Sequence, residues 1–296
     1  MGGILSIALK EAFLMALYTT TAGVSAISPD QIEQLIVMPV ASNSVAFRAA
    51  TLVTTNATET RIPRVTEDPS AAWTAEGEEI GTSDPKVDDI AVLPKKLAGL
   101  TVVSNETLAD TNPAADSIVG DGLTRDIARK VDAAFFGSNT AAPSLQPAGL
   151  EDVAATEVVA PTAWADADPF AEAISNAEGL GLVVSSFVAN PNDALTLAQL
   201  KESSTSNRPL LGSDPSTPTR RALQGVPLLV SPAVTEGTVW GIPSNRAIIV
   251  RRNDVDLQVD KSAYFTSDRT AIRATMRVGF AFTQPSAIQK ITLAAE

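Results

Sequence analysis

Apolar side chains recur every fourth residue between Asn112 and Gly137, which predicts the longest helix of the chain. The stripe consists of Val119, Leu123, Ile127, Val131 and Phe135. This period places the five side chains on one face of an α-helix. Asn112 fits the N-cap, Pro113 fits the first helical position, and Gly137 fits the stop after the last turn. We therefore expect a helix over residues 113–136.

Upstream of this helix, two stretches rich in Thr and Val predict extended strands. They cover residues 45–65 and 86–104 and alternate partially between apolar and polar positions. The sequence WTAEGEEIGTSDP, residues 73–85, lies between them and has neither a helical nor a strand period. The pattern predicts a long hairpin with an irregular tip at about residues 66–89. A loop of this length without its own core is usually functional or disordered.

The expected tip is acidic and contains a tryptophan. Trp73 is followed by Glu76, Glu78, Glu79 and Asp84, with no basic residue among them. A monomer gains little from a large apolar side chain on such a loop. A subunit that buries the loop against a neighbour gains binding energy, because a buried tryptophan often contributes strongly to an interface. The tip is therefore a candidate contact between subunits.

Beyond residue 149 the pattern alternates between short helices and strands. Helices are expected at residues 168–180 and 192–202, the second with Asn192 as its cap. Strands are expected at residues 185–191, 223–234, 246–260 (a strand with its partner) and 269–294. In the last stretch Ile272, Ala274 and Met276 alternate with Arg273, Thr275 and Arg277, which predicts a strand with one buried face.

Composition narrows the possible functions. Hydrophobic residues make up 45% of the 296 residues and aromatic residues only 5%, so the core must consist mainly of aliphatic side chains. The formal net charge of −12 argues against nucleic-acid binding by clustered Lys and Arg. The chain has no Cys and no His, which removes thiolate nucleophiles and the commonest general base and metal ligand. No phosphate-binding glycine motif occurs either. We expect no catalytic residues, no cofactor and no metal.

The first 44 residues predict an arm. Residues 4–26 are largely apolar, but Lys10 and Glu11 interrupt them and no basic residue precedes them, unlike a signal peptide. No apolar run is long enough to span a bilayer, so no membrane contact is expected. A partial helical face in this region either packs on its own domain or lies across another subunit. The small residues at 19–28 favour the second alternative.

Several short motifs follow one another in an order typical of one family. They are Ile62-Pro63, Trp73-Thr74-Ala75-Glu76, Lys95-Lys96-Leu97-Ala98, Val103-Ser104-Asn105-Glu106, Pro147 to Leu150, Asn190-Pro191, Gly225-Val226-Pro227 and Arg277-Val278-Gly279. With the long helix between them, the chain from about Met38 onward resembles the major capsid proteins of tailed bacteriophages. The resemblance implies an α+β fold of the Hong Kong 97 type.

The same resemblance implies how the chain is divided. The parts are an N-terminal arm at 1–44, strands and an extended loop at 45–104, a peripheral domain with a spine helix at 105–149, an axial domain at 150–260, and C-terminal strands that return to the peripheral domain at 261–296. The extended loop would overlap a neighbouring subunit and pair its acids with cations there. The candidate contact residues are Trp73, Glu76, Glu78, Glu79, Asp84, Lys86, Arg125, Arg129, Arg251 and Arg252.

The function that the resemblance implies is assembly. The chain is expected to form hexamers and pentamers of an icosahedral head shell, which encloses double-stranded DNA without gripping it. It would assemble in the cytoplasm of a bacterial host and remain in the virion. Only about 40 residues precede the matching region, so a fused scaffolding segment is not expected. The implied partners are a portal and separate scaffolding or decoration proteins. Two alternatives stay open: an encapsulin-type compartment around cargo enzymes, and a carboxylate-based hydrolase that acts as a monomer.

Overall fold

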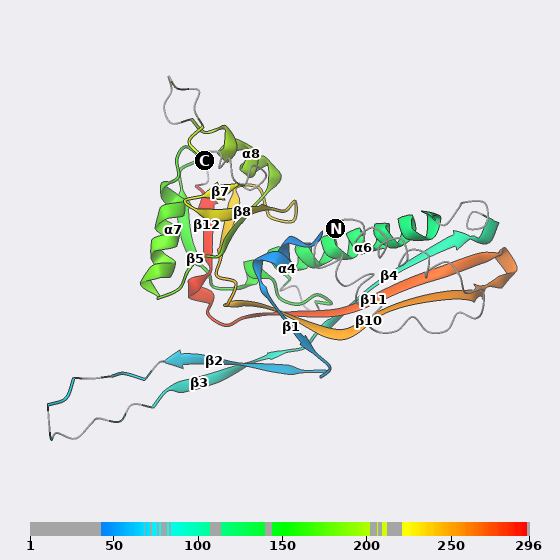
Figure 1. Cartoon of the computed structure of the whole chain (residues 1–296), viewed down its shortest axis with the longest axis horizontal. Coiled ribbons are helices and arrows are strands. Elements are labelled where there is room, and N and C mark those ends of the chain that lie inside the picture. The colour runs from blue at the N-terminus through cyan, green and yellow to red at the C-terminus, as the bar shows by residue number, and fades with distance from the viewer. Residues whose placement is uncertain are drawn as a thin grey trace, which may run out of the picture.

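The computed structural model describes most of the chain. The described residues are 43–67, 69–71, 73–75, 77, 82, 84–106, 114–139, 144–201, 206, 209–211 and 221–294. The expectations for residues 1–42, for Glu76, Glu78 and Glu79, and for the helix cap at Asn112 and Pro113 lie outside them. Helices and strands both build the fold, in two sheets and a projecting hairpin, as predicted for an α+β protein (Figure 1).

Three long strands and the short β1 form a four-stranded sheet in the order β1-β10-β11-β4. These strands are β1 (Thr51–Thr55), β10 (Ala247–Tyr264), β11 (Arg269–Phe282) and β4 (Lys95–Ser104). β1 runs parallel to β10, and the other neighbours are antiparallel. The long helix α6 (Ala114–Phe136) lies along one face of the sheet (Figure 1). Its end at Phe136 agrees with the stop predicted at Gly137.

The strand β11 explains why α6 covers only one face of this sheet. Ala274 and Met276 are buried in the same core cluster as Phe135 of α6, whereas Arg273, which precedes Ala274 in the pleat, is exposed. Successive side chains of a strand point to opposite faces of its sheet. The alternation predicted from the sequence is therefore confirmed, and it places Arg273, Thr275 and Arg277 of β11 on the face away from α6.

A six-stranded sheet, in the order β5-β12-β9-β6-β8-β7, forms the second body. Its strands are β5 (Thr156–Ala160), β12 (Gln289–Leu293), β9 (Thr238–Ile242), β6 (Ser186–Ala189), β8 (Val226–Val230) and β7 (Ala222–Leu223). Helices α7 (Asp168–Gly179) and α8 (Pro191–Gln199) pack on it, with Phe170 and Leu197 buried against Phe187 of β6 in one cluster. Within the described residues, short 3-10 helices lie at Leu150–Asp152, Phe265–Ser267 and Pro285–Ala287.

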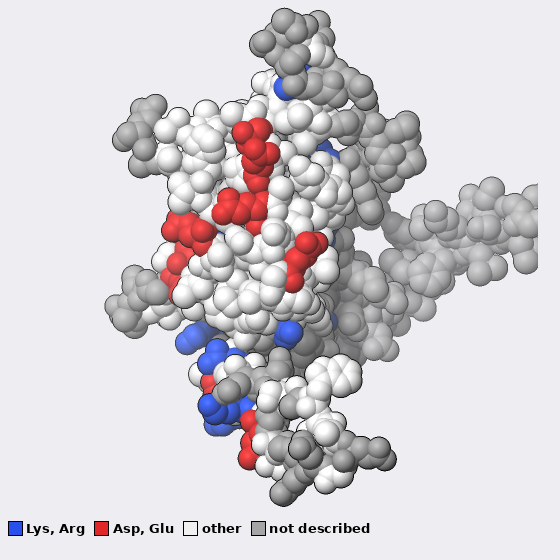
Figure 2. Space-filling model, turned by 90° about the vertical axis from the view of Figure 1, so that its left-hand side faces the viewer, with Lys and Arg blue, Asp and Glu red and all other residues white. Residues whose placement is uncertain are grey.

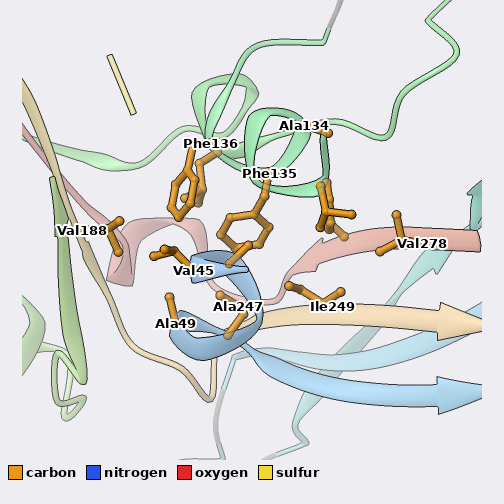
Figure 3. Packing of buried hydrophobic residues seen from close by; sticks show 14 of the residues in the cluster. Val45, Ala49, Ala134, Phe135, Phe136, Val188, Ala247, Ile249 and Val278 are labelled. Atoms are coloured by element: carbon orange, nitrogen blue, oxygen red, sulfur yellow. The ribbon is translucent and has the colours of Figure 1, made fainter. Parts of the chain in front are cut away.

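The two bodies share one hydrophobic core. Phe135 of α6 is fully buried between Phe136 and Phe280, with ring centroids 5.1 Å apart in both pairs. The same cluster contains Val188 and Trp240 from the six-stranded sheet. Figure 3 shows Phe135 and Phe136 lying over Val45, Ala247 and Ile249 at this junction. A continuous apolar core of this kind couples the positions of the two bodies.

The predicted hairpin is present only in its inner part, because β1 and β4, the outer parts of the two predicted strands, pair with β10 and β11 and not with each other. β2 (Thr60–Glu67) and β3 (Lys86–Val92) pair in antiparallel register and form a sheet of their own. At its base, Val92 packs in a small cluster with Val250 and Ala281 of the four-stranded sheet. From there the hairpin projects away from both bodies (Figure 1). The hairpin is therefore anchored at one end only.

The strand predicted at residues 45–65 is wrong in its first part. Val45–Ala49 form a short helix, α4. Its N-terminus is held by Asp132 of α6, which is 6% exposed. The Ser44 hydroxyl donates to Asp132 Oδ1 at 2.5 Å, Val45 N–H to Oδ2 at 3.1 Å, and Ala46 N–H to Oδ1 at 3.0 Å. Free backbone N–H groups at a helix start favour such an acceptor. A contact 86 or more residues away thus overrides the local strand pattern.

Replacing Asp132 with alanine is expected to lower the free energy of unfolding by about 3 kcal/mol, because buried donors lose their acceptor. Asparagine retains one acceptor oxygen, so Asp132→Asn should cost less. Denaturant titration of the purified subunit measures both losses. An alanine variant as stable as the wild type would contradict the role given to this carboxylate.

Asp132 also predicts a pH dependence. Burial raises the pKa of Asp132 above its ordinary value of 3.8, against the hydrogen bonds from Ser44, Ala46 and Val45 that lower it. The folded chain therefore binds this proton more tightly than the unfolded chain does. The stability that this group contributes is greatest below its ordinary pKa and is lost as the pH rises through the folded-state pKa. Unfolding measured across this interval should show that slope in the wild type and not in Asp132→Asn.

Other elements differ from the prediction in detail. The cap of α8 is Asn190, whose side chain accepts a hydrogen bond from Asn192 N–H at 3.0 Å, so the helix begins earlier than expected. β10 is a single strand without a partner inside residues 246–260. The stretch 223–234 contains a two-residue turn at Gln224 and Gly225, both with positive φ, between β7 and β8. β5 and β9 were not predicted as strands.

The sheets also divide the chain at other places than the expected ranges. β12 lies within 261–296 but pairs with β5 and β9 in the six-stranded sheet. Most of β10 lies within 150–260 but pairs with β1 and β11 in the four-stranded sheet. The chain crosses between the bodies twice near its end, and short strand patterns carry no signal for such crossings.

Candidate inter-subunit surfaces

The hairpin β2–β3 presents the first candidate surface. Its stem is held by Arg61–Asp89 and Arg64–Asp88 ion pairs, at 2.9 and 2.7 Å. The hydrogen bond from Arg64 lowers the pKa of Asp88. The stem arginines are thus engaged by stem acids, and the tip from residue 68 to 85 contains no Lys or Arg. The negative charge of residues 68–85 therefore has no compensating cation within that segment, and Lys86 follows it as the first residue of β3.

Trp73 is the most exposed large apolar side chain of this surface. Its relative exposure is 106%, so the subunit by itself gives the indole no shelter. Asp84 and Lys86, at the other end of the tip, are exposed as well. A fully solvated tryptophan beside acidic residues fits a surface that another chain covers.

A row of three cations crosses the four-stranded sheet and forms the second candidate surface. Arg252 of β10 lies opposite Arg277 of β11, which lies opposite Lys96 of β4. Like charges directly opposite one another on a sheet are destabilising, so the row favours an acidic partner. Arg277 alternates with the buried Met276 and Val278, which places it on the face away from α6. We call Lys96, Arg252 and Arg277 the basic row.

The same strand carries apolar side chains beside the basic row. Leu100 of β4 is 59% exposed and Val102 is 36% exposed. Both lie at even-numbered positions with Lys96, and therefore on its side of the strand. This face thus offers cations and apolar area together, which is the complement of an acidic tip with a tryptophan.

The remaining predicted cations are distributed differently. Arg125 and Arg129 are exposed on α6 and line a cavity of about 570 Å³ that also contacts Asn43 and Pro232. They lie on the α6 side of the four-stranded sheet, whereas the basic row lies on the other side. Arg251 is only 6% exposed, so the structure removes it from the accessible surface, while Arg252 is half-buried. The expected cations therefore do not form one site.

The sequence analysis did not identify two residues of the basic row as candidate contacts. Lys96 and Arg277 both belong to motifs quoted above, but strand alternation assigns a face and not a partner. Only the register of β4, β10 and β11 places them beside Arg252. Cations that lie directly opposite one another in neighbouring strands can be found only once the strand register is known.

Charge is separated over the surface. Figure 2 shows acidic side chains spread over the body that carries α7, and basic side chains gathered below it near the hairpin. The exposed acids of this region include Glu157, Asp168, Glu172 and Glu178. Such a separation favours contacts in which unlike faces of two copies meet.

Neither a membrane segment nor a metal site emerges from the described residues. Among them, no helix combines the length and apolarity that a bilayer span requires. No group of three acidic side chains in this part of the chain is arranged to hold a metal ion.

Comparison with known proteins identifies the class. The model of the phage capsid family matches residues 25–293. The chain therefore belongs to the phage capsid family, as a major capsid protein that forms the head shell. No curated protein matches the chain.

Solved capsid structures have the same fold. A protein of Microbacterium phage Oxtober96 is 19% identical over 96% of this chain and 98% of its own, with a TM-score of 0.69. One of Mycobacterium phage Adephagia is 16% identical over 86% of this chain and 91% of its own, with a TM-score of 0.70. The capsid of a native GTA particle is 20% identical over 94% of both chains, with a TM-score of 0.66. The chain is a structural virion component that assembles with copies of itself.

Proposed function

We propose that the chain forms the hexamers and pentamers of an icosahedral shell around double-stranded DNA, and that the hairpin tip joins neighbouring subunits. The observation that carries the contact is the complementarity of two surfaces. The tip has a fully exposed Trp73 and, over residues 68–85, acids without bases, and the four-stranded sheet has the basic row beside exposed Leu100. In this arrangement the tip of one copy lies on the sheet of the next.

The division into domains follows the sheets in this proposal. The six-stranded sheet with α7 and α8 would surround the symmetry axes, and α6 with the four-stranded sheet would form the peripheral domain. The net charge of −12 supports a shell that repels DNA instead of binding it tightly. A portal closes the shell, and separate scaffolding or decoration proteins assist it in the host cytoplasm.

A charge reversal in the basic row tests the contact. Lys96→Glu should impair shell formation because it adds a negative charge where an acidic tip docks. Arg129→Glu is the matched control, because its cation is exposed on the α6 side of the sheet. Size exclusion and negative-stain microscopy compare the two variants with the wild type.

The outcomes separate the candidate surfaces. Loss of shells in Lys96→Glu alone supports docking on the basic row. Loss in Arg129→Glu alone would move the contact to α6, and normal shells in both would contradict a role for either cation. The contents of the wild-type particles, DNA or cargo protein, then distinguish a phage head from an encapsulin-type compartment.

A further inference from the structure

A second cavity, of about 670 Å³, lies between α4 and one end of the six-stranded sheet. Its described lining is Arg48, Ser185, Ser186, Pro191, Arg221, Pro227, Leu228, Leu229, Val230 and Ser244. Arg48 comes from α4, Ser186 is the first residue of β6 and Ser185 precedes it, and Arg221 is the residue before β7. We call this cavity the arginine–serine pocket. None of the surfaces described above uses it.

The described lining of the arginine–serine pocket is positively charged. It contains two arginines and no acidic residue. In the part of the chain that the structure describes, neither Arg48 nor Arg221 forms an ion pair. In a chain with a net charge of −12, two uncompensated guanidinium groups on one cavity are a local exception. They attract an anion from solution.

Ser186 supplies a second, independent polar feature of the same lining. The residue is 5% exposed, and its Oγ is buried without a hydrogen-bond partner. A buried unsatisfied hydroxyl costs stability, so native proteins rarely keep one without a reason. The adjacent Ser185 is satisfied, because its Oγ donates to the Ile242 carbonyl at 2.7 Å and accepts from Ser244 N–H at 2.8 Å. Of these two serines, only Ser186 lacks a partner for its hydroxyl.

We propose that the arginine–serine pocket binds a tetrahedral oxyanion of the phosphate class. Guanidinium groups present paired donors that match phosphate oxygens, and the Ser186 hydroxyl supplies a further donor. A tetrahedral anion offers enough oxygens for two arginines and a hydroxyl, whereas a carboxylate offers two. The ligand is either inorganic phosphate or a phosphodiester of nucleic acid. This binding goes beyond the shell function and does not depend on it.

Thermal unfolding of the purified full-length chain tests the pocket. Inorganic phosphate should raise the midpoint of unfolding above that in sodium chloride or sodium acetate of equal ionic strength. Arg48→Gln and Arg221→Gln should each weaken phosphate affinity by about tenfold, the loss of one charge-assisted contact. Arg129→Gln, on α6, is the arginine control and should bind phosphate as the wild type does.

Ser186→Ala separates a binding role from a structural one. It should reduce phosphate affinity, yet leave the midpoint without phosphate unchanged or higher, because it removes an unsatisfied hydroxyl. Ser175→Ala, at an exposed position of α7, is the serine control. A fall in the phosphate-free midpoint of Ser186→Ala with unchanged phosphate affinity would overturn the assignment of this hydroxyl to the ligand.

The source of the anion is decided by competition. A short DNA duplex that displaces phosphate from the wild type supports a phosphodiester ligand, and phosphate binding that the duplex leaves unchanged supports a free anion. Equal stabilisation by acetate and phosphate would overturn the tetrahedral assignment. The proposal also fails if phosphate gives no stabilisation over chloride, or if both glutamine variants keep the wild-type affinity. Shell formation is not the readout, so these outcomes are independent of the proposed subunit contact.

Discussion

Replacing Phe135 with alanine is expected to lower the free energy of unfolding by about 4 kcal/mol. The ring is fully buried and contacts Phe136, Phe280 and Phe282, with centroids 5.1, 5.1 and 5.6 Å from its own. Its removal leaves a cavity between α6 and β11, at the core that joins the two bodies. The surrounding backbone is fixed by a helix and a sheet, so little collapse can fill the space.

Phe265→Ala provides the matched control for this prediction. Phe265 lies in the turn between β10 and β11 and is 84% exposed. An exposed substitution of this kind should change stability by less than about 0.5 kcal/mol. Denaturant titration of the unassembled subunits compares the two variants. Equal losses in both would contradict the central place given to Phe135.

Replacing Trp73 with alanine is expected to impair assembly without weakening the folded subunit. A tryptophan that anchors an interface contributes about 2 kcal/mol or more, which corresponds to a change of about 30-fold in the association constant of each contact. Because a closed shell repeats the contact in every subunit, the effect on assembly is multiplied. The subunit itself should unfold as before, since the Trp73 side chain is fully exposed.

Leu145→Ala is the control for the tryptophan. Leu145 is also a large exposed apolar residue, at 87%, but lies in the loop after α6 and not on the hairpin. The concentration at which shells first form, measured by light scattering and microscopy, should rise for Trp73→Ala and stay unchanged for Leu145→Ala. Normal assembly of Trp73→Ala would rule out its role as an anchor, whereas a destabilised subunit would show that the indole packs within its own chain.

The basic row could be predicted only in part from the sequence. Alternation in the last strands assigned Arg273 and Arg277 to the face opposite Met276, and the structure agrees. It could not tell that Lys96 lies across from Arg277, because these residues are separated by about 180 positions in the chain. Arg251 and Arg252 were indistinguishable as candidates, although one is buried and the other half-buried.

The sequence by itself determined the features that rest on consecutive residues. The helix that ends at Phe136, the alternation of β11 and the hairpin around an acidic tip follow from local period and turn chemistry. The tertiary structure decided that Val45–Ala49 is helical, because Asp132 holds its start and adds to the local cap, in which Ser44 Oγ accepts from Phe47 N–H. It also decided that β12 joins β5 and that three cations share one row. The physical reason is that period depends on neighbours along the chain, whereas register and burial depend on which distant segments meet.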